Sequence, residues 1–509
     1  MSTSDGSNVS LWSAGDIADA VRRRKVSSRE VLAAFRARVD RYNGPLRLVV
    51  TLDERAERWA HEADEAVLRG DPLGPLHGVP VTVKDSFATE GLRSTSGREE
   101  LSGNFPRQDA EAVAGLRRAG AVVFGKTNLA AGCADVQSAN VLFGAAANPW
   151  NPAYTTGGSS GGSAGAVAAG FSAADLGSDI AGSIRIPAAA CGVFGHRPSF
   201  GVVPMRGHMP PYQPVEPDLA VAGPLASCPD DLETMLDATV GPGPVDRVAW
   251  RVELPPARSS VRVAVWADDP YCPVDGEVRD AVEHAAAVLA DGGVAVEVAR
   301  PSGIRLDDSD DVARRLLASV ALGDYTAGDI EQINAGLRRP GAGLGADFVA
   351  QSYRDWMEAH ARRERLRARW RRFFTHFDAL LLPVSPALVG RHDARPFDKR
   401  SVVIDGNPRS YWDQMVWVNM TGLAGLPTTV VPVRRDSRGL PVGVAVVGPY
   451  LEDRTPLAVA RRLSVLLGPF GRPELTAWQP PTDRDIGRSA PESVSCLPGT
   501  QGRTLPVDI

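Results

Sequence analysis

Residues 155–170 read Thr155-Thr-Gly-Gly-Ser-Ser-Gly-Gly-Ser-Ala-Gly-Ala-Val-Ala-Ala-Gly170. Four glycines and three serines fill positions 157–163, and alanine and valine dominate the rest, which is typical of a helix. A strand-like run from Phe171 to Leu176 follows directly. Because a flexible Gly/Ser linker would not open straight into regular structure, this segment is predicted to be an ordered loop that leads into a helix.

A phosphate-binding loop is one interpretation of these glycines, since glycine-rich backbones at the start of a helix bind anions. Gly157 and Gly162 have the spacing of the Gly-x-x-x-x-Gly-Lys motif, but Ser163 occupies the position where the lysine is required. The loop therefore does not predict a site for nucleotide phosphates.

A nucleophile elbow of the α/β-hydrolase type is a second interpretation, because Gly-x-Ser-x-Gly matches are centred on Ser159 and on Ser160. An elbow needs a preceding strand, whereas residues 148–154 contain two prolines and cannot form a central strand. It also needs a histidine late in the chain, and no histidine follows His392. These two observations disfavour an elbow.

A second segment, Asp179-Ile-Ala-Gly-Ser-Ile-Arg-Ile-Pro187, places Ser183 at a tight turn. Backbone N–H groups converge at such a turn, and a tetrahedral oxyanion requires donors of this kind. No histidine is suitably placed as a base, so the natural partner is Lys84, at the end of the apolar strand Val81-Thr-Val83. Burial there would lower the pKa of Lys84 and leave a fraction of the amine neutral. The alternative for Lys84 is a simple ion pair with Asp85.

Taken together, three segments resemble the amidase signature family. They are the Gly-Gly-Ser-Ser-Gly-Gly-Ser loop, the Gly-Ser-Ile-Arg-x-Pro turn 24 residues later, and the Val-Lys-Asp strand 75 residues before the loop serine. Flanking runs agree in kind and order, among them Gly125-Lys-Thr-Asn128, Cys191-Gly-Val-Phe-Gly195 and Gly425-Leu-Pro427. The resemblance covers about residues 10–475, and it is specific because the motifs occur together in the right order.

The resemblance implies a Ser–Ser–Lys catalytic set, in which Ser183 is the nucleophile, Ser159 the bridging serine and Lys84 the base. It also implies a cis peptide bond between Gly158 and Ser159. The oxyanion is expected to rest on the backbone N–H groups of Ile180, Ala181, Gly182 and Ser183.

Residues that support the catalytic set are implied in the same way. Asp179 and Arg185 are expected to brace the nucleophile turn, and Ser160 is expected to form hydrogen bonds near the catalytic set. Position 181 departs from the family pattern, because it is Ala where the family more often has Gly. This departure predicts a slightly stiffer oxyanion loop.

The substrate pocket is expected to be lined by Cys133, Asp135 and Gln137, which follow the Gly125-Lys-Thr-Asn128 run. Just before them, Ala131-Gly132 replaces the bulkier pair that is typical of the family. Substrate preference therefore does not transfer from the family to this chain.

Helix-like and strand-like segments alternate along the chain, which predicts an α/β fold. Ser28 is expected to cap an early helix that runs through Val39, and a helix over residues 278–289 is predicted between strands over 261–266 and 294–298. The alternation by itself favours a largely parallel sheet. The resemblance implies the amidase-signature fold, with a large mixed central sheet covered by helices on both faces.

The domain organisation follows from the same patterns. Residues 1–479 are predicted to form one amidase signature domain, in which about 200–350 is a variable region that shapes the substrate site. Residues 480–509 are rich in Pro, Ser, Gly, Thr and Asp, lack periodicity, and are predicted to form a loosely ordered tail.

Composition narrows the class of protein. The chain has 509 residues, 43% of them hydrophobic, and a formal net charge of −5, which gives no reason to expect nucleic acid or an anionic membrane as a partner. No apolar run reaches the roughly 20 residues needed to cross a bilayer and no signal peptide is visible, so a cytoplasmic protein is expected. The five cysteines form no Cys-x-x-Cys pair, and neither a metal nor a cofactor is predicted.

The sequence therefore predicts an amide hydrolase that acts through an acyl-enzyme on a small-molecule carboxamide, aryl or acyl amide, or on an ester. One alternative is the glutamine-hydrolysing subunit of an amidotransferase, which passes ammonia to a partner protein. A second alternative is a non-catalytic scaffold with the same fold, which the intact Lys84, Ser159 and Ser183 disfavour. Enzymes of this type are often homodimers, so a homodimer is a further expectation.

Overall fold

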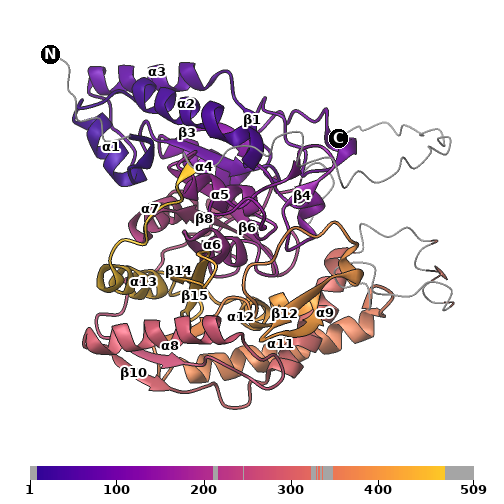
Figure 1. The fold of residues 1–509 in the computed structure, drawn as a ribbon. Helices are drawn as coiled ribbons and strands as arrows, with labels where there is room; N and C mark the ends of the chain where they lie inside the picture. The colour runs from indigo at the N-terminus through magenta and orange to yellow at the C-terminus, as the bar shows by residue number, and fades with distance from the viewer. Residues whose placement is uncertain are drawn as a thin grey trace. The chain divides into compact units, whose positions relative to one another are not determined.

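Eleven strands form one sheet in the computed structural model, which describes residues 9–209, 216–244, 246–321, 328, 331–332, 335 and 348–475. The chain divides into two units, Met1–Pro473 and Glu474–Ile509, and the sheet belongs to the first (Figure 1). In sheet order the strands are β1 (Val49–Leu52), β3 (Val122–Thr127), β2 (Pro80–Lys84), β6 (Ala174–Asp179), β8 (Val221–Ala226), β7 (Phe194–Arg197), β14 (Thr428–Arg435), β15 (Pro441–Val447), β11 (Ala379–Pro383), β9 (Arg262–Val265) and β10 (Ala295–Val298).

The sheet is mixed, which confirms the α/β fold with a large mixed sheet and corrects the largely parallel sheet that the alternation favoured. Strands β3, β2 and β6 run parallel, as do β11, β9 and β10. Every pairing from β6 through β8, β7, β14 and β15 to β11 is antiparallel. The alternation misled because β14 and β15 are joined by a short connection without a crossover helix, and such a connection produces antiparallel neighbours.

Helices cover both faces of the middle strands. The described helices are α1 (Ala14–Arg22), α2 (Ser28–Leu46), α3 (Ala56–Arg69), α4 (Glu111–Arg118), α5 (Gly161–Ala168), α6 (Arg185–Cys191), α7 (Pro229–Thr239), α8 (Gly276–Asp291), α9 (Leu306–Ala321), α11 (Tyr353–Phe373), α12 (Val416–Leu423) and α13 (Arg454–Leu467). Gly443 of β15 faces Ala189 of α6, whereas Gly448, five residues further on, faces Pro456 of α13. Because side chains alternate along a strand, α6 and α13 lie on opposite faces.

Two small hairpins stand outside this sheet. They pair β4 (Ala139–Asn140) with β5 (Gly144–Ala145), and β12 (Ser401–Ile404) with β13 (Asn407–Ser410). The early helix begins at Ser28, but its N-cap is Ser27 and not Ser28. Ser27 accepts a hydrogen bond from the Glu30 backbone, and the Glu30 side chain accepts one from the Ser27 backbone in return.

Helix α5 is buried along its whole length, unlike a surface helix with one polar face. Its glycines allow close approach: a Cβ added at Gly162 would lie 2.3 Å from the backbone nitrogen of Asn128. The glycine-rich loop therefore lets a helix pack directly against the end of β3. The predicted tail, residues 480–509, and part of the predicted variable region lie outside the described residues, so the predicted domain boundaries stay predictions.

Candidate active site

Two neighbouring parallel strands end at the candidate site. Lys84 is the last residue of β2, and the register pairs Thr82 and Val83 of β2 with Asp175 and Leu176 of β6. The carboxyl ends of parallel strands meet at the same edge of a sheet, which is where α/β proteins usually place their sites. Lys84 is therefore brought beside the last residues of β6, Ser178 and Asp179.

The glycine-rich loop carries Ser159 to the same edge. The Gly158–Ser159 peptide bond is cis, as the resemblance implied. The Lys84 Nζ atom lies 2.6 Å from Ser159 Oγ, and both side chains are buried. The backbone nitrogen of Ser160 donates to the Ser183 carbonyl at 3.1 Å, so the loop and the nucleophile turn run side by side.

Burial lowers the pKa of Lys84, because the uncharged amine is favoured where water is excluded. Cys133, Asp179 and Asp175 act in the opposite direction, but burial is the dominant cause. The ion pair with Asp85 that was the alternative for Lys84 is absent among the described contacts. Asp85 instead accepts hydrogen bonds from the backbone and side chain of Thr95.

The nucleophile turn is braced by a buried ion pair. Arg185 donates to both carboxylate oxygens of Asp179, at 2.8 and 2.9 Å, and reaches the Val418 carbonyl of α12 at 2.7 Å. Burial acts to raise the pKa of Asp179, but the adjacent Arg185 guanidinium outweighs it and holds the pKa well below its usual range. The turn itself needs Gly182, whose φ of 102° is one that other residues rarely adopt.

The four predicted oxyanion donors are not equivalent. The Gly182 N–H already donates to Asp179 Oδ1 at 2.8 Å, so it holds the turn in shape and is not free for a ligand. Within the described part of the chain, the N–H groups of Ile180, Ala181 and Ser183 have no protein acceptor. The turn therefore offers three free donors, with Ser183 at its apex.

Ser160, which was expected to form hydrogen bonds near the catalytic set, contacts the end of β6. Its hydroxyl donates to the Ser178 carbonyl at 3.1 Å and accepts from the Ser178 backbone nitrogen at 3.4 Å. Ser160 thereby fastens the start of α5 to the end of β6, the strand that leads into the nucleophile turn.

The three predicted pocket residues have separate environments. Cys133 lies close enough to Lys84 to affect its pKa. Asp135 binds Arg400 at 2.6 Å, and the Gln137 side chain accepts from and donates to the Asp393 backbone, each at 2.8 Å. The polar groups of Asp135 and Gln137 are thus engaged with the segment 391–411.

Two residues that the sequence analysis missed are Ser178, which contacts Lys84, and His208, which contacts Ser178. Ser178 Oγ lies 3.0 Å from Lys84 Nζ, and His208 Nε2 lies 2.9 Å from Ser178 Oγ. Ser178 directly precedes Asp179, and this position in the sequence could have indicated that it lies near the site. No sequence pattern indicates the position of His208, because a single histidine far along the chain does not show which strand it will contact.

Lys126 is a second buried lysine with a different role. It extends from β3, and its amine donates to the Phe87 carbonyl and to the hydroxyls of Thr89 and Ser94. Burial lowers its pKa to about 8. Lys126 thus ties down the loop that follows Lys84.

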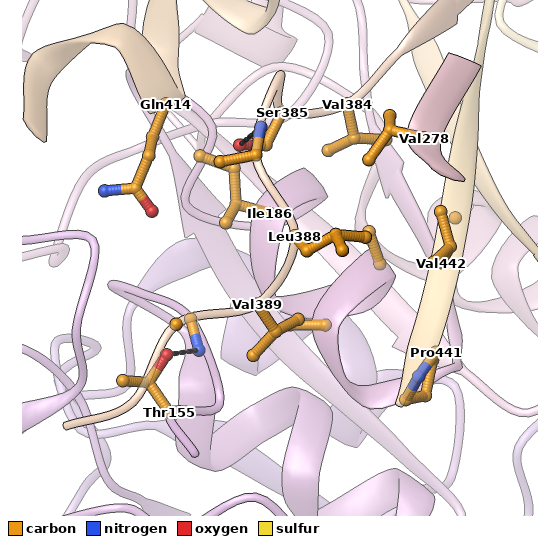
Figure 2. Close-up of a pocket in the computed structure, with 16 residues that line it drawn as sticks. Thr155, Ile186, Val278, Val384, Ser385, Leu388, Val389, Gln414, Pro441 and Val442 are labelled. Atoms are coloured by element: carbon orange, nitrogen blue, oxygen red, sulfur yellow. Dashed lines mark hydrogen bonds between the residues drawn. The ribbon is translucent and has the colours of Figure 1, made fainter. Parts of the chain in front are cut away.

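An apolar pocket adjoins both loops (Figure 2). Gly157, two residues before Ser159, and Ile186, three residues after Ser183, both line it. Figure 2 shows the rest of the wall to be largely aliphatic, with Thr155, Ser385 and Gln414 as its polar side chains. The labelled apolar residues of the wall are Ile186, Val278, Val384, Leu388, Val389, Pro441 and Val442.

Metal-binding clusters and membrane-spanning helices are not found among the described residues. No group of three or more His, Cys, Asp or Glu residues there could hold a metal ion. In the same ranges, no helix combines the length and apolar character needed to cross a membrane.

Known proteins resemble this chain in sequence. The family-wide sequence profile named Amidase matches residues 30–457. A glutamyl-tRNA(Gln) amidotransferase subunit of Thermus thermophilus is 34% identical, over 88% of this chain and 95% of the relative. The protein of the same name from Thermosynechococcus vestitus is 31% identical, over 86% of this chain and 94% of the relative.

Solved structures resemble it in fold. A 6-aminohexanoate cyclic dimer hydrolase superposes with a TM-score of 0.77 at 26% identity, over 92% of this chain and 99% of that structure. A bacterial aryl acylamidase of the amidase signature family also gives 0.77, at 25% identity, over 90% of this chain and 97% of that structure. The sequence profile spans most of the chain and the structures agree with it, so the chain belongs to the amidase family.

Proposed function

We propose that this amide-bond hydrolase works through an acyl-enzyme on Ser183, with Ser159 as the bridging serine and Lys84 as the base. The observation that carries the proposal is the 2.6 Å contact between the buried Lys84 amine and the Ser159 hydroxyl. A buried amine next to a hydroxyl, with lowered pKa, has the properties required of a general base.

The reaction would proceed in two halves. Ser183 Oγ attacks the amide carbonyl carbon, its proton passes to Ser159, and the Ser159 proton passes to the neutral Lys84. The same route returns a proton to the departing amine, which breaks the carbon–nitrogen bond and leaves an ester on Ser183. Water then attacks that ester, gives up a proton along the same route, and releases the acid.

The negative oxygen formed in each half needs donors that are already in place. The N–H groups of Ile180, Ala181 and Ser183 are free for this purpose, whereas Gly182 is held by Asp179. We therefore propose that three donors, and not the four expected from the resemblance, hold the oxyanion.

A panel of amides and esters, assayed with the wild type beside Lys84→Ala and Ser183→Ala, tests the proposal. Both variants are expected to lose at least about a hundredfold in rate, the low end for removal of a base or nucleophile. A fluorophosphonate probe should label the wild type and leave Ser183→Ala unlabelled. Unchanged hydrolysis in either variant would refute the assignment, and an unlabelled folded wild type would favour the scaffold alternative.

A glutamine-hydrolysing amidotransferase subunit is the second candidate, and the sequence comparisons favour it over a small-molecule amidase. Relatives 31–34% identical, covered almost end to end, are named as subunits of a glutamyl-tRNA(Gln) amidotransferase. In this case the substrate is glutamine, the product is ammonia, and further subunits are required as partners.

The apolar pocket favours the first candidate. Glutamine carries an ammonium and a carboxylate that need charged partners, whereas none of the described residues that line this pocket has a charged side chain. An amide with an aliphatic or aryl group suits such a wall better.

Free glutamine and an uncharged carboxamide of similar size, assayed at equal concentration, separate the two candidates. Faster hydrolysis of the uncharged amide supports the small-molecule amidase. Glutaminase activity that rises when the other amidotransferase subunits are added supports the second candidate. Ser183→Ala is the control in both assays, because either reaction requires the nucleophile.

A further inference from the structure

A buried histidine is connected to the proposed base through one hydroxyl. His208 Nε2 lies 2.9 Å from Ser178 Oγ, and Ser178 Oγ lies 3.0 Å from Lys84 Nζ. Lys84 therefore has two hydroxyl neighbours, Ser159 on one side and Ser178 on the other. The mechanism above uses only Ser159.

The position of His208 is fixed by the backbone that follows Lys84. Residues 207–209 pair with residues 86–88: Ala88 N donates to the Gly207 carbonyl at 2.8 Å, and Met209 N donates to the Ser86 carbonyl at 2.6 Å. The His208 ring also packs edge-on against Phe87, with ring centroids 4.9 Å apart. The imidazole is thus held in one place relative to the lysine.

The ring of His208 is neutral. It is 7% exposed, and burial lowers its pKa to about 3, with the positive charges of Lys84 and Lys126 acting in the same direction. A neutral imidazole carries one proton, so one ring nitrogen donates and the other accepts.

The direction of the hydrogen bonds from His208 through Ser178 to Lys84 decides whether the lone pair of Lys84 is available to Ser159. A neutral lysine amine has two N–H donors and a single lone pair, and only the lone pair can take the Ser159 proton. The Ser178 hydroxyl has one proton, and its described side-chain contacts are Lys84 and His208. If that proton pointed to Lys84, Ser178 would compete with Ser159 for the lone pair.

We propose that His208 is a positioning residue whose Nε2 accepts the Ser178 proton and so reserves the Lys84 lone pair for Ser159. Ser178 then accepts an N–H from Lys84, and the ring proton resides on Nδ1, which is buried and has no acceptor among the described residues, so this tautomer leaves one ring donor unpaired. This inference rests on the proposed function, because it gives His208 a role only if Lys84 is the base.

Charged and titratable groups around this chain of bonds are few. Cys133, Asp179 and Asp175 act on the pKa of Lys84, and the two lysines act on that of His208. Of these, only the two lysines act directly on the ring. A change at His208 should therefore be felt mainly at these two lysines, of which Lys84 is the one joined to the ring through Ser178.

The test is the pH dependence of fluorophosphonate labelling at Ser183, which needs no knowledge of the substrate. In His208→Leu, Ser178 would turn its proton toward Lys84. We expect the maximal labelling rate to fall about tenfold, a typical cost for loss of a group that orients a reacting one. The rise of the rate with pH should also shift to lower pH by about half a unit, since a hydrogen bond to the lone pair stabilises the neutral amine.

Conservative and double variants separate this role from packing. His208→Gln keeps an acceptor near the position of Nε2 and should restore both the rate and the pH profile. His208→Leu added to Ser178→Ala should cause no further change, because the bridge is already gone. His77→Leu is the matched control and should leave the profile in place. His77 is buried, its ring is hydrogen-bonded to the Ala63 carbonyl, and it lies three residues before β2, whereas Lys84 is the last residue of that strand.

Three kinetic results would overturn the inference. They are an unchanged pH profile in His208→Leu, equal losses in the Leu and Gln variants at equal melting temperature, and additive losses in the double variant. Nitrogen-15 spectra of the histidines, wild type minus His208→Gln, should show a ring protonated at Nδ1, and protonation at Nε2 would also overturn it. Labelling of Ser183→Ala at the wild-type rate would instead refute the proposed function.

Discussion

Lys84 combines two properties that only lysine can supply at this position. Its side chain is long enough to reach Ser159 from the last residue of β2, and its amine can lose a proton when it is buried. Arginine has the same charge and similar reach but remains protonated in proteins. The proposed chemistry therefore distinguishes the two residues more sharply than a structural role would.

Lys84→Arg is accordingly expected to lose at least about a hundredfold in rate, as Lys84→Ala does. In the wild type, kcat/KM should rise with pH as the amine loses its proton, and the midpoint should lie below the ordinary lysine value of 10.5 because burial lowers the pKa. A pH–rate profile measures both. An arginine variant with wild-type rate would show that no proton leaves this side chain.

The residues of the proposed catalytic set could be identified from sequence, because their motifs have fixed spacing. Two features could not. The Gly182 N–H is occupied because Asp179 turns back onto it, and His208 meets Ser178 only because its segment pairs with the backbone after Lys84. Both depend on contacts between parts of the chain whose separation has no periodic signal.

Helix α5 sets the distance between the glycine-rich loop and the end of β3. Gly162, the second residue of the helix, has no room for a side chain, because an added Cβ would lie 2.3 Å from a backbone atom of Asn128. Backbone cannot move aside as a flexible side chain can. The helix must therefore shift if this glycine is replaced.

Gly162→Ala is expected to lower the free energy of unfolding by about 1–3 kcal/mol, as overpacking does. Gly15→Ala is the matched control, since Gly15 is the second residue of α1 and an added Cβ would lie 3.5 Å from the nearest atom. It should leave stability unchanged or raise it by up to about 1 kcal/mol. Denaturant melts measure both, and equal effects would contradict the close packing.

The loop after β2 depends on Lys126. Its pKa falls from 10.5 to about 8 on burial, so between these values the folded chain has lost a proton that the unfolded chain still holds. The contribution of Lys126 to the free energy of unfolding therefore increases as the pH rises from about 8 to 10.5.

Lys126→Met removes that contribution. The difference in unfolding free energy between wild type and variant should move in favour of the wild type as pH rises through this window. Denaturant melts at about pH 7.5 and about pH 10 measure the change. A difference that stays constant across the window would show that the lysine has the same pKa in the folded and unfolded chain.

Hydrophobic periodicity in the sequence predicted helices and strands at residue ranges close to those in the structure. The helix predicted over 278–289 is α8, Gly276–Asp291, and the strands predicted over 261–266 and 294–298 are β9, Arg262–Val265, and β10, Ala295–Val298. Strand direction was predicted less well, because the alternation of elements does not distinguish a crossover from a short return between β14 and β15. The N-cap of α2 is Ser27, one residue before the predicted Ser28. Both serines are equally good caps, but only Ser27 has a Glu three positions later.

The whole sheet and every residue of the candidate site belong to the unit Met1–Pro473. The composition of residues 480–509 predicts no contribution to a packed core. A chain that ends at residue 479 should therefore keep the fluorophosphonate reactivity and melting temperature of the full chain. A loss of either would assign the last thirty residues a role in folding or in the site.

The residues of the proposed catalytic set and the apolar wall of the pocket come from different parts of the chain. Lys84, Ser159, Ser178, Ser183 and His208 all come from the first half, whereas most of the apolar wall comes from residues 278, 384–390, 414 and 441–443. Under the proposed function, exchange of the second half between related enzymes would therefore change the substrate pocket and leave the proposed catalytic residues unchanged. Diversification, in nature or by directed evolution, can proceed on one part without reinventing the other.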